Sequence, residues 1–245
     1  MRGESGLTLA PAILPAAALL PPAERRRASR VVKATLAIGL EAATHAGADV
    51  STLATVFSAS GADGHNCHAL CEQLASNDRQ ISPTRFHNSV HNAAAGYWSI
   101  ATHSMAPSQV ICAFDAGFGA GLIDALGQVN VDGQRTLLVA YDSEYPEPLL
   151  AKRETPDCGG IGLVLAPEQS ERSLWRISVT PSRDPAPGYE NPDLEYLRTH
   201  IPALRSLPLL EQLARGGAGS VCVDYLPGRA ANSARTIHQR LPHAG

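Results

Sequence analysis

The stretch Ser108-Gln-Val-Ile-Cys-Ala-Phe-Asp-Ala-Gly-Phe-Gly-Ala-Gly-Leu-Ile-Asp-Ala125 decides the fold. Its first part predicts an apolar strand over 109–113, and its second part predicts a helix over 116–129. Many α/β proteins place a nucleophile at such a strand-to-helix bend, because the side chain there faces the site beyond the end of the strand. In this chain the bend carries Asp115, and neither Ser nor Cys stands beside it.

Strands and helices alternate on both sides of this stretch. Predicted helices cover 23–45, 65–75 and 116–129, and predicted strands cover 53–60, 109–113 and 135–141. Two consecutive strands follow over 159–166 and 174–180, and we expect them to pair as an antiparallel hairpin. Helices over 193–198 and 207–215 and a strand over 220–225 complete the pattern. It indicates an α/β fold with a mostly parallel sheet flanked by helices.

The composition is that of one globular domain. The chain has 245 residues, of which 44% are hydrophobic, and this length can bury a sizeable core. We expect residues 1–19 to be irregular or an altered first strand, residues 20–225 to form the domain, and residues 226–245 to be a flexible tail. The net charge of -3 argues against a dedicated nucleic-acid binder.

The cysteines and the first segment indicate a cytoplasmic protein. The five cysteines are odd in number, which fits reduced thiols better than a disulfide framework. The apolar segment 7–20 is interrupted by Pro11 and Pro15 and followed by Pro21, so we expect neither a signal peptide nor a membrane span.

The spacing of residues speaks against three kinds of site. The bend lacks the Gly-x-Ser-x-Gly pattern of a hydrolase, and Asp115 as a nucleophile would need a base and an oxyanion site that the sequence does not locate. The glycines after it lack the Gly-x-Gly-x-x-Gly spacing of dinucleotide sites. One helix can present only two of its four candidate metal ligands together, so we expect no metal and no cofactor. Those four candidates are His65, Cys67, His68 and Cys71.

Several separated motifs resemble a known family. They are Leu20-Pro-Pro-Ala-Glu-Arg-Arg-Arg27, Val56-Phe-Ser-Ala-Ser60, Ser82-Pro-Thr-Arg-Phe-His-Asn-Ser-Val-His-Asn92, Ala95-Gly-Tyr-Trp-Ser-Ile100, Gly121-Leu-Ile-Asp-Ala125, Leu138-Val-Ala-Tyr-Asp142, Pro146-Glu-Pro-Leu149 and Leu207-Pro-Leu-Leu210. Over about residues 20–215 the chain resembles the N-terminal half of β-ketoacyl synthases. Within that family it is similar to the short chain-length-factor type of bacterial aryl-polyene and xanthomonadin-like clusters.

The resemblance implies a thiolase-like fold, of which this chain supplies about one half. In that family the nucleophilic Cys lies where a buried strand meets a helix, so that the helix N-terminus lowers its pKa. Aligning a conserved small–aliphatic pair of the family on Gly121-Leu122 places Asp115 in the nucleophile position. Cys112 lies three residues earlier, on the strand. The two catalytic histidines of the family belong to its second half, and neither His87 nor His91 matches them.

The resemblance therefore implies a subunit without activity of its own. Such a subunit would form a heterodimer with an active β-ketoacyl-acyl-carrier-protein synthase and set the chain length in fatty-acid- or polyene-type biosynthesis. The region 82–102 matches the part of condensing enzymes near the acyl tunnel and the dimer seam. Its candidates for tunnel or interface residues, each with ordinary packing as the alternative, are Phe86, His87, His91, Tyr97 and Trp98.

Two further alternatives stay open. Arg25, Arg26 and Arg27 either dock an acidic partner, such as the acyl carrier protein, or form a solvated helix face. The chain is either the inactive subunit described above or an active 3-oxoacyl-acyl-carrier-protein synthase or acyltransferase that uses Cys112. A degenerate protein without function is a third possibility.

Overall fold

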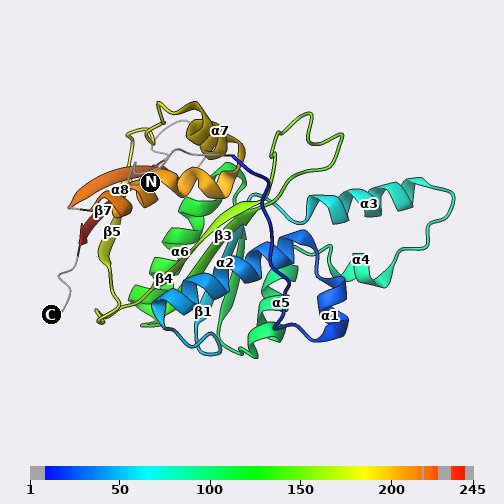
Figure 1. Cartoon of the computed structure of the whole chain (residues 1–245), viewed down its shortest axis with the longest axis horizontal. Helices are drawn as coiled ribbons and strands as arrows, with labels where there is room; N and C mark the ends of the chain where they lie inside the picture. Colours follow the sequence, from blue (N-terminus) through cyan, green and yellow to red (C-terminus); the bar gives the residue numbers. More distant parts are fainter. Residues whose placement is uncertain (1–8, 217, 226–232, 241–245) are drawn as a thin grey trace.

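The computed structural model describes residues 9–216, 218–225 and 233–240, and Figure 1 shows how they are arranged. The helices are α1 (Pro22–Arg27), α2 (Arg30–Ala46), α3 (Gly64–Ala75), α4 (Pro83–His87), α5 (Ala93–Thr102), α6 (Gly117–Val131), α7 (Pro192–His200) and α8 (Leu207–Arg215), with two 3₁₀ turns, η1 (Phe114–Ala116) and η2 (Pro202–Ser206). The strands are β1 (Ala54–Ala59), β2 (Ser108–Cys112), β3 (Thr136–Asp142), β4 (Gly159–Leu165), β5 (Trp175–Ser182), β6 (Gly219–Asp224) and β7 (Ser233–Arg240).

The first sheet has the strand order β2-β1-β3-β4. β1 runs parallel to both of its neighbours, with Phe57 opposite Val110 of β2 and opposite Val139 of β3. β4 pairs antiparallel with β3, because a turn-rich loop without a helical crossover joins the two strands. The expected α/β fold with a mostly parallel sheet flanked by helices is confirmed.

Both faces of this sheet are covered. Successive side chains of a strand point to opposite faces, so Phe57 and Val139 pack toward α2 and α5, while Val56 and Leu138 pack toward α6. Every residue of β1 and β3 is buried as a result. Burial on both faces explains why these two strands read as nearly continuous apolar runs in the sequence.

The single helix predicted over 23–45 is two helices in the structure. Ala28 and Ser29 are extended and separate α1 from α2. The Ser29 side chain accepts a hydrogen bond from the backbone N–H of Val32 at 3.4 Å and so caps α2. Ser29, which stands between Arg27 and Arg30, was the sequence signal for a helix start at this point.

A second sheet, which we did not expect, has the antiparallel order β5-β7-β6. The predicted hairpin of 159–166 with 174–180 is therefore wrong, because β4 pairs with β3 and β5 pairs with β7. β7 falls within the segment that we expected to be a flexible tail. It has no apolar run, but strands pair through backbone groups and need none. Residues 226–232 and 241–245 lie outside the described part of the chain.

The segment before α1 follows the body without forming a helix or strand over residues 9–17. The backbone N–H of Ala12 donates to Asp157 at 2.6 Å, and the Arg30 guanidinium pairs with the same carboxylate at 2.5 Å. Leu20 is 1% exposed and belongs to the core. The segment is therefore attached at two points, and residues 1–8 lie outside the described range.

Helices α2 and α5 come into close contact where Gly39 faces the Trp98 ring. Trp98 is 1% exposed and packs edge-on against Phe57, with ring centroids 6.0 Å apart. A Cβ at Gly39 of α2 would lie 2.5 Å from the Trp98 ring. Only Gly lets α2 approach the indole this closely.

Replacing Gly39 with Ala should therefore destabilise the protein. The gain of roughly 1 kcal/mol in helix propensity is outweighed by overpacking, which typically costs about 1–3 kcal/mol. Gly127→Ala in α6 is the matched control, because no atom lies within 4 Å of a Cβ there. Urea unfolding of both variants is the measurement, and a Gly39→Ala protein as stable as the control would contradict this packing.

Candidate functional site at the strand-to-helix bend

The bend between β2 and α6 is strained. Phe114 has a backbone φ of 51°, in the left-handed region that bulky side chains rarely adopt. The residue is also 55% exposed. After η1 the chain enters α6, which crosses close to β6 because Gly119 leaves no Cβ to meet the Asp224 carbonyl. The glycines after the bend thus serve close packing and do not form a nucleotide loop.

Asp115, the residue after Phe114, is held by two guanidinium groups. Arg153, from the β3–β4 loop, donates to one carboxylate oxygen at 2.7 Å, and Arg205, from η2, lies 3.2 Å from the other. The Arg153 guanidinium also stacks over the Phe114 ring, 3.6 Å from its centroid. Charge pairing and stacking together hold both residues of the bend in place.

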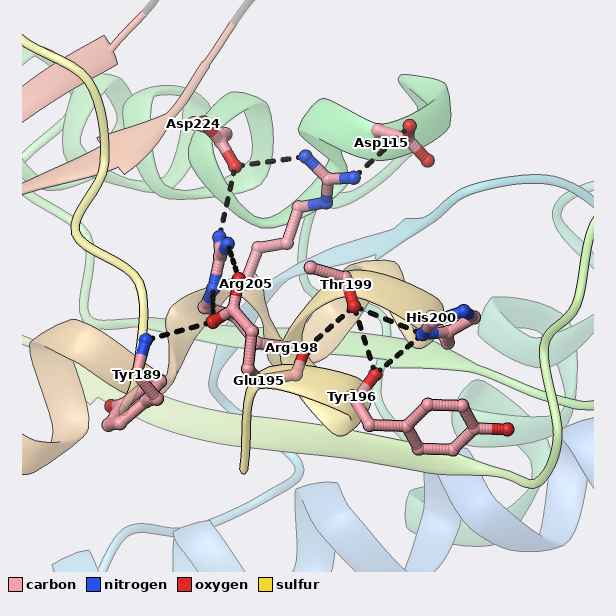
Figure 2. Close-up of polar contacts among 9 residues, drawn as sticks. All are labelled: Asp115, Tyr189, Glu195, Tyr196, Arg198, Thr199, His200, Arg205 and Asp224. Carbon is pink, nitrogen blue, oxygen red and sulfur yellow. Dashed lines mark hydrogen bonds and ion pairs between the residues drawn. The ribbon is translucent and has the colours of Figure 1, made fainter. Parts of the chain in front are cut away.

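Figure 2 shows the ion pairs continuing from Arg205 away from the bend. Arg205 lies between Asp115 and Asp224, with its second ion pair at 2.9 Å. Arg198 contacts the same Asp224 carboxylate at 3.8 Å and forms a two-pronged pair with Glu195 at 2.8 and 2.5 Å. The hydrogen bond from Arg198 is the main cause that lowers the pKa of Glu195 to about 2. Acidic and basic groups alternate along the chain of contacts, so their charges largely compensate.

A pocket of about 190 Å³ lies beside the bend. We call it the bend pocket, and its lining residues are Phe114, Asp115, Arg153, Glu154, Thr199, His200 and Pro202. The Nδ1 atom of His200 lies 2.9 Å from the Tyr196 carbonyl oxygen, which can only accept, so Nδ1 carries the proton in that contact. Its Nε2 atom lies 3.7 Å from the Glu154 carboxylate.

Nothing in this arrangement activates a nucleophile. Both carboxylate oxygens of Asp115 are paired with guanidinium groups. Cys112 ends β2, and partial burial together with the nearby Asp142 carboxylate raises the pKa of its thiol. A reactive cysteine needs the opposite shift, because the thiolate is the nucleophile. The ion pairs of Asp115 and the raised pKa of Cys112 both disfavour these residues as nucleophiles.

Asp142 connects the first sheet to η2, the turn that holds the bend, through hydrogen bonds. It ends β3, is 5% exposed, and accepts hydrogen bonds from the backbone N–H groups of Ser60 at 2.8 Å and Ala203 at 2.7 Å. Burial raises the pKa of Asp142 to about 6, although these hydrogen bonds and the Arg153 charge act in the opposite direction. Ala203 belongs to η2, which also carries Arg205, so Asp142 anchors the turn that holds Asp115.

The structure separates the predicted tunnel and interface residues into two groups. Tyr97 and Trp98 are each 1% exposed, and the Tyr97 hydroxyl donates to Asn88 at 3.2 Å. Both side chains belong to the hydrophobic core of this chain, while their role in lining a tunnel stays a prediction. Phe86 is 67% exposed, and His87 and His91 are exposed as well. None of the contacts around Asp115 described above involves these five residues.

The three arginines of α1 are exposed but partly engaged. Arg25 donates to the carbonyl oxygens of Ala18 at 2.7 Å and Leu20 at 2.9 Å. Arg27 pairs with Glu24 at 3.0 Å. In the described part of the chain, no group of three or more His, Cys, Asp or Glu side chains could hold a metal ion. Over the same residues, no helix combines the length and the apolar character that a membrane span requires.

Sequence reasoning missed the partners of Asp115. Arg153 and Arg205 stand 38 and 90 residues further along the chain, and no spacing rule connects them to the bend. Asp142 had a usable signal, because it ends a largely apolar strand whose carboxyl end lies at the same edge of the sheet as that of β2. The same reasoning could not have shown that α7 and η2 fold over this edge.

Comparison with known proteins shows a match to one family model and similarity to a solved ketosynthase complex. The family model described as "Beta-ketoacyl synthase, N-terminal domain" matches residues 6–198. The structure of a ketosynthase (ApeO) in complex with its chain length factor (ApeC) from Xenorhabdus doucetiae is similar to this chain with a TM-score of 0.64 and 22% identity, over 90% of this chain and 82% of the other. This likeness confirms the expected thiolase-like, condensing-enzyme fold.

One further likeness is partial, and the search of curated sequences found no match. A β-ketoacyl synthase from Burkholderia phymatum STM815 is similar over 54% of this chain and 34% of its own, with a TM-score of 0.43 and 15% identity. A likeness this partial carries no inference.

The raised pKa of Asp142 predicts a specific pH dependence. A folded-state pKa of about 6 above the usual 3.8 means that the folded protein binds a proton which the unfolded chain releases. Stability from this group is complete below about pH 4 and is lost as the pH rises through 6, by at most about 3 kcal/mol. The difference in unfolding free energy between wild type and Asp142→Asn should therefore fall between pH 4.5 and 7.5.

Chemical unfolding of both proteins across that pH range is the measurement. The Asn variant is the reference because it cannot titrate at this position, while all other groups remain. A difference that stays constant or rises with pH would show that Asp142 is not held in a desolvated site.

Proposed function

Because the chain belongs to the β-ketoacyl synthase N-terminal domain family, we propose that it is a non-catalytic subunit that pairs with an active ketosynthase. The observation that carries this proposal is the ion-paired Asp115 at the bend, where the resemblance places the nucleophile. Condensation begins with acyl transfer to a thiolate, and this bend supplies a carboxylate neutralised by two arginines. The subunit then acts through its partner.

The proposed pairing has support from an edge of the first sheet. β2 is the terminal strand in the described order β2-β1-β3-β4. The N–H of Thr55 donates to the Pro107 carbonyl and the N–H of Ala113 to the Ala59 carbonyl, so odd-numbered residues of this segment face β1. Because backbone groups alternate along a strand, Ser108, Val110 and Cys112 direct theirs toward the open edge. An open edge of this kind is a template for pairing with another chain.

Apolar side chains near β2 add to this support. Met105 is 96% exposed in the turn before the strand, and Ile100 is 38% exposed on α5, which packs against β2. ApeC is the chain length factor of ApeO, and we propose the same type of role for this chain. The pathway would be fatty-acid- or polyene-type biosynthesis in the cytoplasm.

An acyl carrier protein is the second partner that we propose. Arg25, Arg26 and Arg27 lie on exposed α1, and Asn88 donates to the Arg27 carbonyl at 3.1 Å, which places α4 beside them. Arg85 and His87 of α4 extend this basic surface on a chain with a net charge of -3. A local excess of positive charge favours an acidic partner.

Val110→Pro tests the subunit pairing. Proline removes the outward N–H of Val110 and leaves the bonds to β1 intact, which edge strands tolerate. We expect at least about tenfold weaker binding to a ketosynthase subunit, equivalent to about 1.4 kcal/mol. Val110→Ala is the control, because it shortens the side chain but keeps the N–H, and it should bind like the wild type.

Binding is measured by titration calorimetry with candidate ketosynthases, and monomer folding by thermal unfolding of each variant. A proline variant that is folded and binds as tightly as the alanine variant would exclude this edge from the interface. Absence of binding by the wild type to every ketosynthase tried would reject the subunit role itself.

The alternative function is an active enzyme that uses Cys112, a thiol that retains solvent exposure. Its raised pKa argues against it, so we expect no covalent acyl adduct after incubation with acyl-CoA or acyl carrier protein. Intact-protein mass spectrometry is the measurement, with an active ketosynthase as the positive control. An adduct on the wild type that disappears in Cys112→Ala would establish the enzyme instead.

A further inference from the structure

Phe114 combines two unfavourable features. Its backbone is in the left-handed region, at φ 51°, although it has a bulky side chain. The residue is also 55% exposed, so burial in the core does not offset the strain. Such outliers persist only where surrounding contacts over-determine them, and they concentrate at binding and functional sites.

The surroundings of Phe114 fix its ring in one place. Arg153 stacks on the ring at 3.6 Å and is itself held by Asp115 at 2.7 Å. Asp115 is held from its other side by Arg205 at 3.2 Å. The exposed aromatic ring is thus rigid before any ligand arrives, and a rigid aromatic side chain loses little entropy on binding.

The ring lines the bend pocket, which leaves space next to it. The volume of about 190 Å³ exceeds the roughly 150 Å³ of a cavity that holds benzene, so a large side chain fits. Phe114 and Pro202 provide apolar walls. Arg153 is paired with Asp115, and Glu154 accepts a hydrogen bond from the Tyr196 hydroxyl at 2.6 Å, so the ionised groups on the rim already have partners. Ionised groups that already have partners favour a neutral occupant over an anion.

We propose that the bend pocket receives an apolar side chain of the partner ketosynthase subunit and that Phe114 is its rigid anchor. This inference rests on the proposed function. The position supports it, because Cys112, whose backbone groups face the open edge, stands only two residues before Phe114, so that pairing along β2 brings a partner chain to the pocket. Aromatic residues that lose their solvent on association are among the usual centres of binding energy in interfaces.

Phe114→Gly separates an anchor from a merely structural residue. Glycine adopts the left-handed conformation without strain, so the free Gly variant should melt about 2–4 °C above Phe114→Ala, which keeps the strain. Both variants lose the ring, so both should bind the ketosynthase subunit at least tenfold more weakly than the wild type. A structural role predicts lower melting temperatures and unchanged binding.

Thr199→Trp adds a large side chain at another residue that lines the bend pocket and leaves Phe114 in place. We expect this variant to melt like the wild type and to bind at least tenfold more weakly. Leu174→Ala is the control, because Leu174 is 61% exposed but lies in the β4–β5 loop, away from the bend, and its variant should bind normally.

The outcomes distinguish this inference from the proposed function. If the wild type binds a ketosynthase while Phe114→Gly or Thr199→Trp binds within twofold of it, the pairing stands and the anchor is wrong. If hexanoate binds the free chain in ligand-observed NMR and Phe114→Gly abolishes that binding, a small acyl ligand is the occupant and the inference is overturned. If the wild type binds no ketosynthase, both proposals fail.

Discussion

The ion pairs of Asp115 with Arg153 and Arg205 are the constraint on which the site depends. They neutralise the only charged group of the bend and fix Arg153 over Phe114, which keeps that residue in a left-handed backbone conformation. The resemblance places the nucleophile of condensing enzymes at this bend, and our proposal rests on the paired carboxylate that stands there. These contacts make the bend a rigid surface, and rigidity favours recognition.

The sheet supports this constraint through Asp142. This carboxylate ties the ends of β1 and β3 to η2, through the N–H groups of Ser60 and Ala203. η2 in turn carries Arg205 to the bend. The carboxyl ends of parallel strands are where α/β folds usually place their sites. At this edge of the sheet, the carboxylates and guanidinium groups form ion pairs with one another.

Local sequence patterns predicted most helices and strands, but they did not predict which distant strands pair. β1, α6 and α8 were found close to their observed bounds, because apolar periodicity and turn residues are local signals. The β4–β5 hairpin was wrong because β7, the partner of β5, has no apolar pattern to reveal it. Asp115 was identified as the residue of the bend, but its arginines lie in other segments, and only the fold brings them together. Tyr97 and Trp98 have the residue types of an interface, yet close packing against α2 buries them.

We propose that this chain works by joining a ketosynthase through the β2 edge and the bend. Amide hydrogen exchange of the chain, alone and with its ketosynthase partner, tests it most directly. The outward amides of Ser108, Val110 and Cys112 and the amide of Phe114 should exchange quickly in the free chain and become protected in the complex, while the buried strand β3 stays unchanged. A complex in which residues 108–114 exchange as fast as in the free chain would contradict the claim.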